Sequence, residues 1–176
     1  MRYKRLTGEK IYLSALIPDD AENITGWFNN QEITQYLSIH RQVKSLEIVK
    51  EDVTEYIKTG AAFAIFCKET DKIIGFIVLD DDSIEVLIGE MEYRSKGYDE
   101  EAIEFLLDYG FNLKNCGIIY ITAYSHDKEA LTLYEKMGFN KALVMREVLI
   151  HGRNKYDKIY FDMLASEYLR RGQSNA

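Results

Sequence analysis

Three consecutive strand-sized segments in the middle of the chain restrict the fold more than any other feature. Residues 61–68, 72–79 and 83–91 are rich in β-branched and aromatic side chains, which favour strands. The two connections between them, Glu69-Thr70-Asp71 and Asp80-Asp81-Asp82, have the length of hairpin turns. Segments joined by hairpins pair with their neighbours, so the sequence predicts an antiparallel sheet at the centre of the fold.

Further elements are predicted on both sides of these strands. Before them we expect a strand and three helices, at residues 10–15, 18–29, 31–37 and 46–59. Pro18 suits the first turn of one helix, and Ser45 can cap another. After them we expect a helix from about residue 98, a strand at 118–123, a helix after residue 127, and strands at 141–150 and 158–164.

This order of elements predicts an α/β fold of the α+β kind. Its central sheet is mixed and mostly antiparallel, with one parallel pair and flanking helices. No linker or repeat divides the chain, so residues 1–168 are expected to form a single domain, followed by a flexible tail at 169–176.

Composition excludes several classes of partner. The net charge of −7 argues against nucleic-acid binding, which needs a basic surface. No apolar run approaches the roughly 18 residues that cross a membrane, and the N-terminus lacks an apolar signal core, so we expect a cytoplasmic protein with no membrane partner. The histidines, at 40, 126 and 151, lack metal-ligand spacing, so no metal is expected.

The turn after the predicted strand 83–91 carries the only local chemistry that suggests a ligand. Arg94 and Lys96 supply positive charge, and Gly97 permits a positive φ and a close approach of the ligand. The helix that follows directs its first backbone N–H groups at the same point, as a phosphate requires. An ordinary strand–helix connection is the alternative for this turn taken alone.

Three patterns in order resemble the GNAT superfamily of N-acetyltransferases, in its ribosomal-protein (Rim-type) and spermidine acetyltransferase branch. Arg94 and Gly97 match the Arg/Gln-x-x-Gly-x-Gly/Ala signature, and residues 130–139, ALTLYEKMGF, match a second pattern downstream. The third pattern is the C-terminal hairpin around residues 146–157, and residues 6–10 and 27–30 resemble the same branch.

The resemblance implies a site for acetyl-CoA between two parallel strands that splay apart, 83–91 and 118–123. The expected cofactor contacts are Leu87, Ile88 and Gly89 along the strand and Arg94, Ser95, Lys96, Gly97, Tyr98 and Asp99 in the turn. Two residues depart from the family pattern: Asp99 replaces Gly or Ala, and Asp127, another expected cofactor contact, replaces an Asn. Acids at 99 to 101 would repel a pyrophosphate.

The resemblance also assigns chemistry to two side chains. Tyr134 is expected to protonate the departing CoA thiolate, with a core tyrosine as the alternative. Glu85 is expected to help remove the proton of the attacking amine, with a solvent-facing strand residue as the alternative. The acceptor wall is expected at Trp27, Asn30 and Tyr36, with core packing as the alternative for both aromatic residues.

The sequence therefore predicts an N-acetyltransferase that moves acetyl from acetyl-CoA to a primary amine by direct attack. A protein N-terminus, a polyamine and another small amine are all open as acceptors. A monomer or homodimer is expected. The alternative is a non-catalytic domain that binds or senses acyl-CoA.

Overall fold

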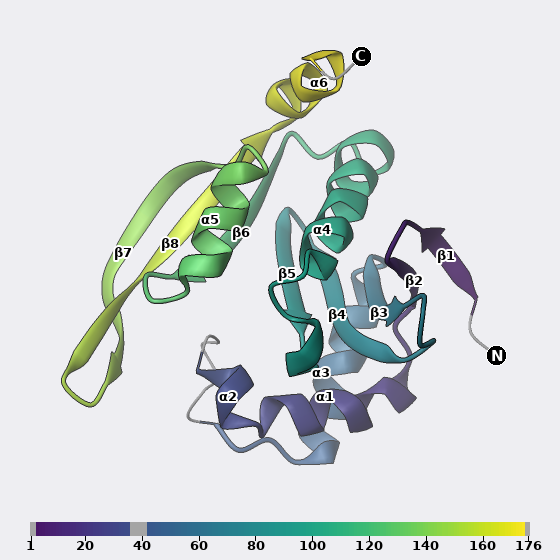
Figure 1. The fold of residues 1–176 in the computed structure, drawn as a ribbon, viewed down its shortest axis with the longest axis vertical. Coiled ribbons are helices and arrows are strands. Elements are labelled where there is room, and N and C mark those ends of the chain that lie inside the picture. The colour runs from purple at the N-terminus through teal and green to yellow at the C-terminus, as the bar shows by residue number, and fades with distance from the viewer. Residues whose placement is uncertain (1–2, 36–41, 175–176) are drawn as a thin grey trace.

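A single mixed sheet organises the chain. The computed structural model describes residues 3–35 and 42–174, with side chains as far as residue 171. Within these residues the sheet has eight strands in the order β1-β2-β3-β4-β5-β6-β8-β7 (Figure 1). The strands are β1 (Lys4–Thr7), β2 (Ile11–Ala15), β3 (Ala62–Cys67), β4 (Ile73–Asp80), β5 (Ser83–Ile88), β6 (Ile118–Tyr124), β7 (Asn140–His151) and β8 (Asn154–Leu164).

Helices lie on both faces of the sheet. They are α1 (Ala21–Phe28), α2 (Gln31–Thr34), α3 (Leu46–Lys58), α4 (Tyr98–Asp108), α5 (Lys128–Lys136) and α6 (Ala165–Ser174). Short 3-10 turns occur at Pro18–Asp20 and Met91–Tyr93, and a π-helical turn at Tyr109–Leu113. No helix in the described part of the chain is long and apolar enough to cross a membrane.

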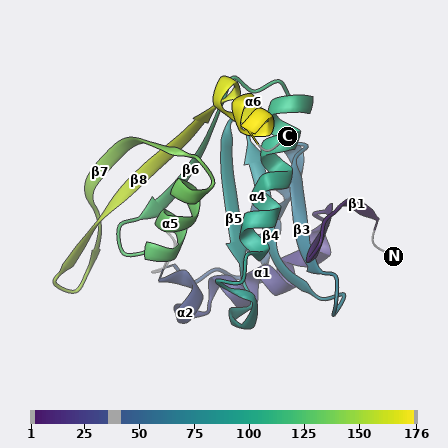
Figure 2. The ribbon, with the colours of Figure 1, turned by 45° about the horizontal axis from the view of Figure 1, so that its top comes forward.

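The sheet consists of two halves that are joined by very little pairing. All neighbouring strands are antiparallel except β5 and β6, which are parallel and pair only at Ser83↔Tyr120 and Ile84↔Ile121. Beyond these two pairs the strands separate, and Figures 1 and 2 show β6, β8 and β7 leaning away from β5. The backbone of β5 that faces β6 is therefore left without a strand partner after Ile84.

Two apolar cores hold the helices to the sheet. Because side chains alternate along a strand, Ile84 and Ile88 of β5 belong to the core under α4, whereas Leu87 belongs to the core under α1 and α3. Figure 2 shows α4 in front of the sheet and α1 passing across the opposite side. Residues of β5 can therefore reach both faces of the molecule.

The predicted meander and the helices around it are confirmed. Strands β3, β4 and β5 are consecutive antiparallel neighbours, and Ser45 caps α3 by accepting a hydrogen bond from the Ile48 N–H. Several boundaries differ. The helix predicted at 31–37 is α2, which ends at Thr34, and positions 36 and 37 lie outside the described residues. Strand β8 begins at Asn154 and not at residue 158, and β5 ends at Ile88 and not at residue 91. A 3-10 turn intervenes, in which the Tyr93 N–H donates to the Glu90 carbonyl at 3.0 Å.

The sequence pattern predicts neither β1 nor α6, and α6 runs into the segment expected to be a tail. The α6 sequence is polar on average, and Ala165, Tyr168 and Leu169 are its only apolar residues, so few positions are available for an apolar pattern. Tertiary contacts hold the helix in place: Arg171 pairs with Glu104 at 2.6 Å, and Tyr168 stacks on Phe111 with ring centroids 4.9 Å apart. These contacts reach across the sequence, so local patterns do not reveal them.

Candidate active site

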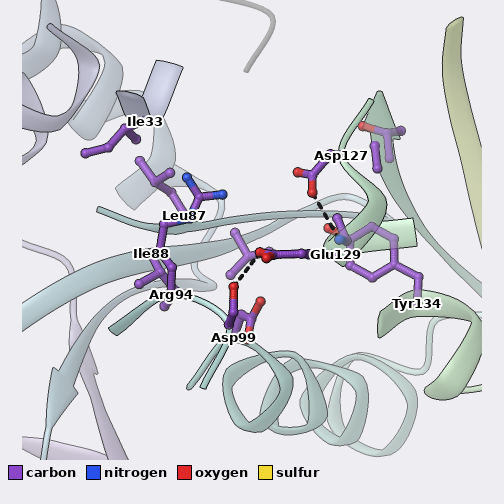
Figure 3. Close-up of a pocket in the computed structure, with 13 residues that line it drawn as sticks. Ile33, Leu87, Ile88, Arg94, Asp99, Asp127, Glu129 and Tyr134 are labelled. Atoms are coloured by element: carbon purple, nitrogen blue, oxygen red, sulfur yellow. Dashed lines mark hydrogen bonds between the residues drawn. The ribbon is translucent and has the colours of Figure 1, made fainter. Parts of the chain in front are cut away.

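A cavity opens where β5 and β6 separate; we call it the gap cavity. Its walls come from β5, from the turn after β5, from β6 and from α5 (Figure 3). The lining residues are Ile33, Val86, Leu87, Ile88, Arg94, Ser95, Asp99, Thr122, Ala123, Asp127, Glu129, Ala130 and Tyr134. An extended ligand entering here would meet the part of β5 that has no strand partner.

The turn between β5 and α4 has the backbone that an anion site requires. Gly97 precedes the first residue of α4 with φ 78° and ψ 20°, a conformation that glycine adopts without strain. The Lys10 ammonium donates to the Lys96 carbonyl at 2.7 Å and so braces the turn from β2. The start of α4 lies beside the gap cavity, where its N–H groups and helix dipole favour negative charge.

Acidic side chains surround the single arginine of the gap cavity. Asp99, Asp127 and Glu129 line the same cavity as Arg94, and the Ser95 hydroxyl donates a hydrogen bond to Glu129 across it (Figure 3). Burial raises the pKa of both Asp99 and Asp127, and the positive charge of Arg94 acts in the opposite direction. In the described part of the chain no group of acidic, histidine or cysteine side chains is placed to hold a metal ion.

The acids at 99 to 101 do not act together on the gap cavity. Glu100 pairs with Lys136 at 2.8 Å, and Glu101 accepts the backbone N–H of Lys10 at 3.0 Å. Only Asp99 of the three lines the gap cavity. The repulsion expected from this run of acids is therefore mainly that of Asp99, while Glu129 adds a charge from another helix.

A second cavity lies on the other side of the opening; we call it the Glu85 cavity. It has a volume of about 390 Å³ and draws its lining from α1, α3, β5, β6 and β8. The Tyr56 hydroxyl donates to Glu85, 3.0 Å from each carboxylate oxygen. Solvent reaches Glu85 through the cavity, but the surrounding protein limits its hydration, and this burial raises the pKa of Glu85. The hydrogen bond from Tyr56 opposes that shift.

Tyr134 lies where the two cavities meet. It is one of four residues that line both cavities, with Val86, Thr122 and Ala123. Its ring is buried against Phe139 and Phe161, and among the described residues its hydroxyl has no hydrogen-bond partner. Burial raises the pKa of Tyr134 above its ordinary value, and the charges of Asp127 and Asp99 add to the shift. The phenol is therefore protonated at neutral pH and free to donate toward a ligand.

Comparison with known proteins identifies the family of this chain. Residues 10–140 match the sequence profile of the acetyltransferase (GNAT) domain. The chain belongs to the GNAT family of acetyltransferases. The resemblance seen in the sequence is thereby confirmed, and so is the predicted fold class, a mostly antiparallel sheet with one splayed parallel pair.

Relatives that align with this chain over nearly their whole length are described as N-acetyltransferases. The chain is 25% identical over 170 residues to an uncharacterized N-acetyltransferase, p20, of Bacillus licheniformis, with 91% of this chain and 96% of the relative covered. It is 26% identical over 173 residues to spermidine N(1)-acetyltransferase of Vibrio cholerae, with 93% and 98% covered. The prediction of an acetyltransferase is confirmed by these matches.

Solved structures show the same fold. The crystal structure of spermidine N-acetyltransferase from Vibrio cholerae in complex with CoA and spermine aligns with a TM-score of 0.79 at 24% identity, covering 92% of this chain and 99% of that one. Another structure of that enzyme, described as dodecameric, aligns with a TM-score of 0.76 at 23% identity, covering 93% and 99%.

The predicted strand contacts of this GNAT chain are only partly gathered at the gap. Leu87 and Ile88 line the gap cavity. Gly89 donates its N–H to the Ile74 carbonyl at 2.8 Å, so this donor is already engaged on the β4 side. A Cβ on Gly89 would lie 2.0 Å from the Trp27 ring, which explains the glycine by packing.

The predicted turn contacts divide in the same way. Arg94, Ser95 and Asp99 line the gap cavity, and Gly97 lines an adjoining groove beside α5. The Lys96 side chain is exposed, and the Tyr98 ring packs on Tyr93 with centroids 5.3 Å apart. Lys96 and Tyr98 can therefore serve an anion at this turn through their backbone.

The predicted acceptor residues lie outside both cavities or outside the described chain. Trp27 is buried and donates its indole N–H to Glu90 at 2.8 Å, so its environment is that of a core residue. Asn30 caps α2 by accepting the Glu32 N–H at 2.9 Å. Tyr36 lies outside the described residues.

Among the polar lining residues that the sequence prediction missed are Tyr56, Glu129 and Lys158. Tyr56 appears in the sequence only as part of the apolar stripe of a helix, and nothing local indicates where its hydroxyl points. Glu129 appears as a favourable acid in the first turn of α5. Lys158 has no distinguishing feature in the sequence, and only the pairing of β8 with β6 brings it to the cavity. Long-range pairing, and no local signal, brings these side chains to the cavities.

Proposed function

We propose that this GNAT chain transfers the acetyl group of acetyl-CoA to a primary amine by direct attack. The observation that carries the proposal is the position of Tyr134. Its buried, protonated hydroxyl lies between a cavity suited to an extended cofactor and a cavity that contains a carboxylate. A group that donates a proton to a leaving thiolate belongs at such a junction.

The gap cavity supports acetyl-CoA as the cosubstrate. The free backbone edge of β5 can pair with the pantetheine amides, as an added strand would. The α4 N-terminus and Arg94 suit the pyrophosphate. The structural neighbour from Vibrio cholerae contains CoA, and a shared fold makes the same location the natural one to test.

The proposed reaction needs a neutral amine and a protonated leaving group. The amine nitrogen attacks the thioester carbonyl carbon and forms the C–N bond, while a β5 backbone N–H stabilises the developing oxyanion. Glu85, directly or through water, takes the proton that the ammonium form must lose. The C–S bond then breaks, and Tyr134 donates a proton to the CoA sulfur. The nitrogen, which gained a positive charge in the attack, loses its second proton, and this proton restores the phenol of Tyr134.

The acceptor enters from the Glu85 cavity in this proposal. Spermidine acetyltransferases among the relatives support a small amine. Core packing of Trp27 and helix capping by Asn30 favour the lining of the Glu85 cavity over those two residues as the acceptor wall. A cytoplasmic location and a monomeric or dimeric state stay predictions, and light scattering would measure the oligomeric state.

The test is thiol release from acetyl-CoA across a panel of polyamines, amino acids, aminoglycosides and peptides with a free N-terminus. We expect at least one amine to raise thiol release well above hydrolysis and to yield an acetylated product by mass spectrometry. Calorimetry with CoA runs in parallel. Binding of CoA without turnover of any amine would refute the enzyme and favour an acyl-CoA binding domain. No binding at millimolar CoA would refute both.

A further inference from the structure

Opposite charges lie on different walls of the Glu85 cavity. Glu85 is on β5 and accepts a hydrogen bond from Tyr56. Burial raises the pKa of Tyr56, and the negative charges of Asp52 and Asp80 add to this shift. Lys158 lies on β8, across the cavity. The cavity therefore has an acidic wall and a basic wall.

Strand register places the two walls in neighbouring rows. Extending the β5–β6 pairing by one residue sets Glu85 level with Thr122, which pairs with Tyr160. Lys158 pairs with Tyr124, two residues farther along β6. Because side chains alternate along strands, Glu85 and Lys158 point to the same face of the sheet, one row apart.

Among the described residues, Lys158 is in no ion pair, whereas the other lysine of the cavity is in one. Lys44 pairs with Asp52 at 2.5 Å and lies over the Phe28 ring at 5.1 Å. Within the described residues Lys158 forms no ion pair, and its ammonium lies 5.2 Å from the centre of the Tyr160 ring. The Lys158 charge acts on Glu85 across the cavity without a direct ion pair, so the ammonium can also pair with an anionic group of a substrate that enters between them.

We propose that the acceptor is a small primary amine that also carries an anionic group, such as a carboxylate. The amine lies beside Glu85 and Tyr134, and the anionic group pairs with Lys158. This inference rests on the proposed acetyl transfer and names the substrate class for it.

The same charges disfavour a long polyamine. When one nitrogen of a polyamine loses its proton to attack, the remaining nitrogens stay positively charged near neutral pH. Lys158 would repel them, and Lys44 with Asp52 offers no net negative charge in compensation. A molecule with one amine and one anionic group matches both walls.

The test compares matched acceptors that differ in the anionic group. The pairs are lysine against cadaverine and phosphoethanolamine against ethanolamine, with spermidine as a further acceptor, and kcat/KM is measured at saturating acetyl-CoA. We expect the anionic member of at least one pair to be preferred by about tenfold, as one partly screened charge pair allows. Spermidine should be poorer than that member.

Two variants assign the preference to Lys158. Lys158→Gln should bring the ratio within the preferred pair close to one. Lys155→Gln is the matched control: Lys155 is on the same strand, points to the opposite face and is exposed in an ion pair with Glu147. It should keep the wild-type ratio. Thermal unfolding checks that both variants fold.

The inference is overturned if neither pair favours its anionic member, or if Lys158→Gln leaves the ratio unchanged. If no amine is acetylated, acetyl transfer fails, and the inference is still decided by calorimetric titration of the same pairs with CoA present. Tighter binding of the anionic member that disappears in Lys158→Gln upholds it. Equal binding within both pairs refutes it.

Discussion

The gap cavity and the Glu85 cavity share Tyr134 but differ in how they present charge. In the gap cavity three carboxylates, Asp99, Asp127 and Glu129, surround Arg94. In the Glu85 cavity one carboxylate faces Lys158, and Lys44 is already neutralised by Asp52. Side-chain charge alone would therefore favour an anionic ligand in the Glu85 cavity over one in the gap cavity, where acetyl-CoA is proposed to bind.

The backbone resolves this contradiction. The gap cavity has the unpaired edge of β5 and the N-terminus of α4, which are fixed donors for an extended, phosphate-bearing ligand. Its acids reduce affinity for that ligand but do not remove these donors. The Glu85 cavity instead presents opposite side-chain charges, Glu85 on β5 and Lys158 on β8. The comparison teaches that, under the proposed function, the main chain defines the cofactor class and side chains define the acceptor.

The largest expected effect comes from the residue that both cavities share. Tyr134→Phe should lower kcat by about 10- to 1000-fold, because the CoA thiolate would leave without a proton donor. The Kd for CoA should stay near wild type, since the ring is kept. Steady-state kinetics and CoA calorimetry measure the two quantities. An unchanged kcat would remove Tyr134 from the mechanism.

Glu85→Gln should act on one cavity alone. It should lower kcat/KM for the acceptor by about 10- to 100-fold, because the proton of the amine loses its acceptor. The loss should shrink as pH rises and more of the amine is already neutral. Tyr56→Phe is the matched variant, since it removes only the hydroxyl that binds Glu85. A loss that is independent of pH would assign Glu85 to substrate binding.

A smaller effect should follow from pH in the gap cavity. Burial raises the pKa of Asp99 and Asp127, so they become protonated as pH falls through these raised values, and repulsion of the pyrophosphate declines. The Kd for CoA should therefore fall about two- to fivefold between pH 8 and pH 5. The same shifts stabilise the fold below the ordinary carboxyl pKa, and this stabilisation is lost as pH rises through the raised values.

The variant Asp99→Asn distinguishes the titration of the protein from the titration of CoA itself. Because CoA has a phosphate that titrates near pH 6, part of the pH dependence belongs to the ligand. The variant should bind CoA more tightly than wild type at pH 8 and show a weaker pH dependence. Calorimetry at both pH values measures it. An identical slope in the two proteins would show that only the ligand titrates.

The smallest expected effect concerns the contact between Ser95 and Glu129. Glu129→Gln should tighten CoA binding by about two- to threefold, because it removes one partly exposed negative charge from the cavity. It should also weaken the hydrogen bond that Ser95 donates to residue 129. Glu135→Gln is a suitable control on the same helix, because Glu135 pairs with Lys141 at the surface. Weaker binding in Glu129→Gln would mean that the Ser95 contact shapes the turn for the ligand.

Local sequence was informative where chemistry and structure are both local. The hairpin strands 61–91, the αL glycine at 97 and the Ser45 cap follow from residue type and spacing, because each depends on neighbours in the chain. Tyr134 was also predicted as a site residue from the sequence, but through the family resemblance, since an aromatic in a helix stripe is ordinarily a core residue.

Only the tertiary structure decided which polar groups meet. Whether an acid faces a cavity depends on partners far along the chain: Glu100 is engaged by Lys136, Glu101 by the Lys10 backbone, and Asp99 by neither. Lys158 faces Glu85 because β8 pairs with β6 and not with β5. Sequence patterns determine elements because backbone preferences act over a few residues. The assembled sheet determines the site because charges act through space.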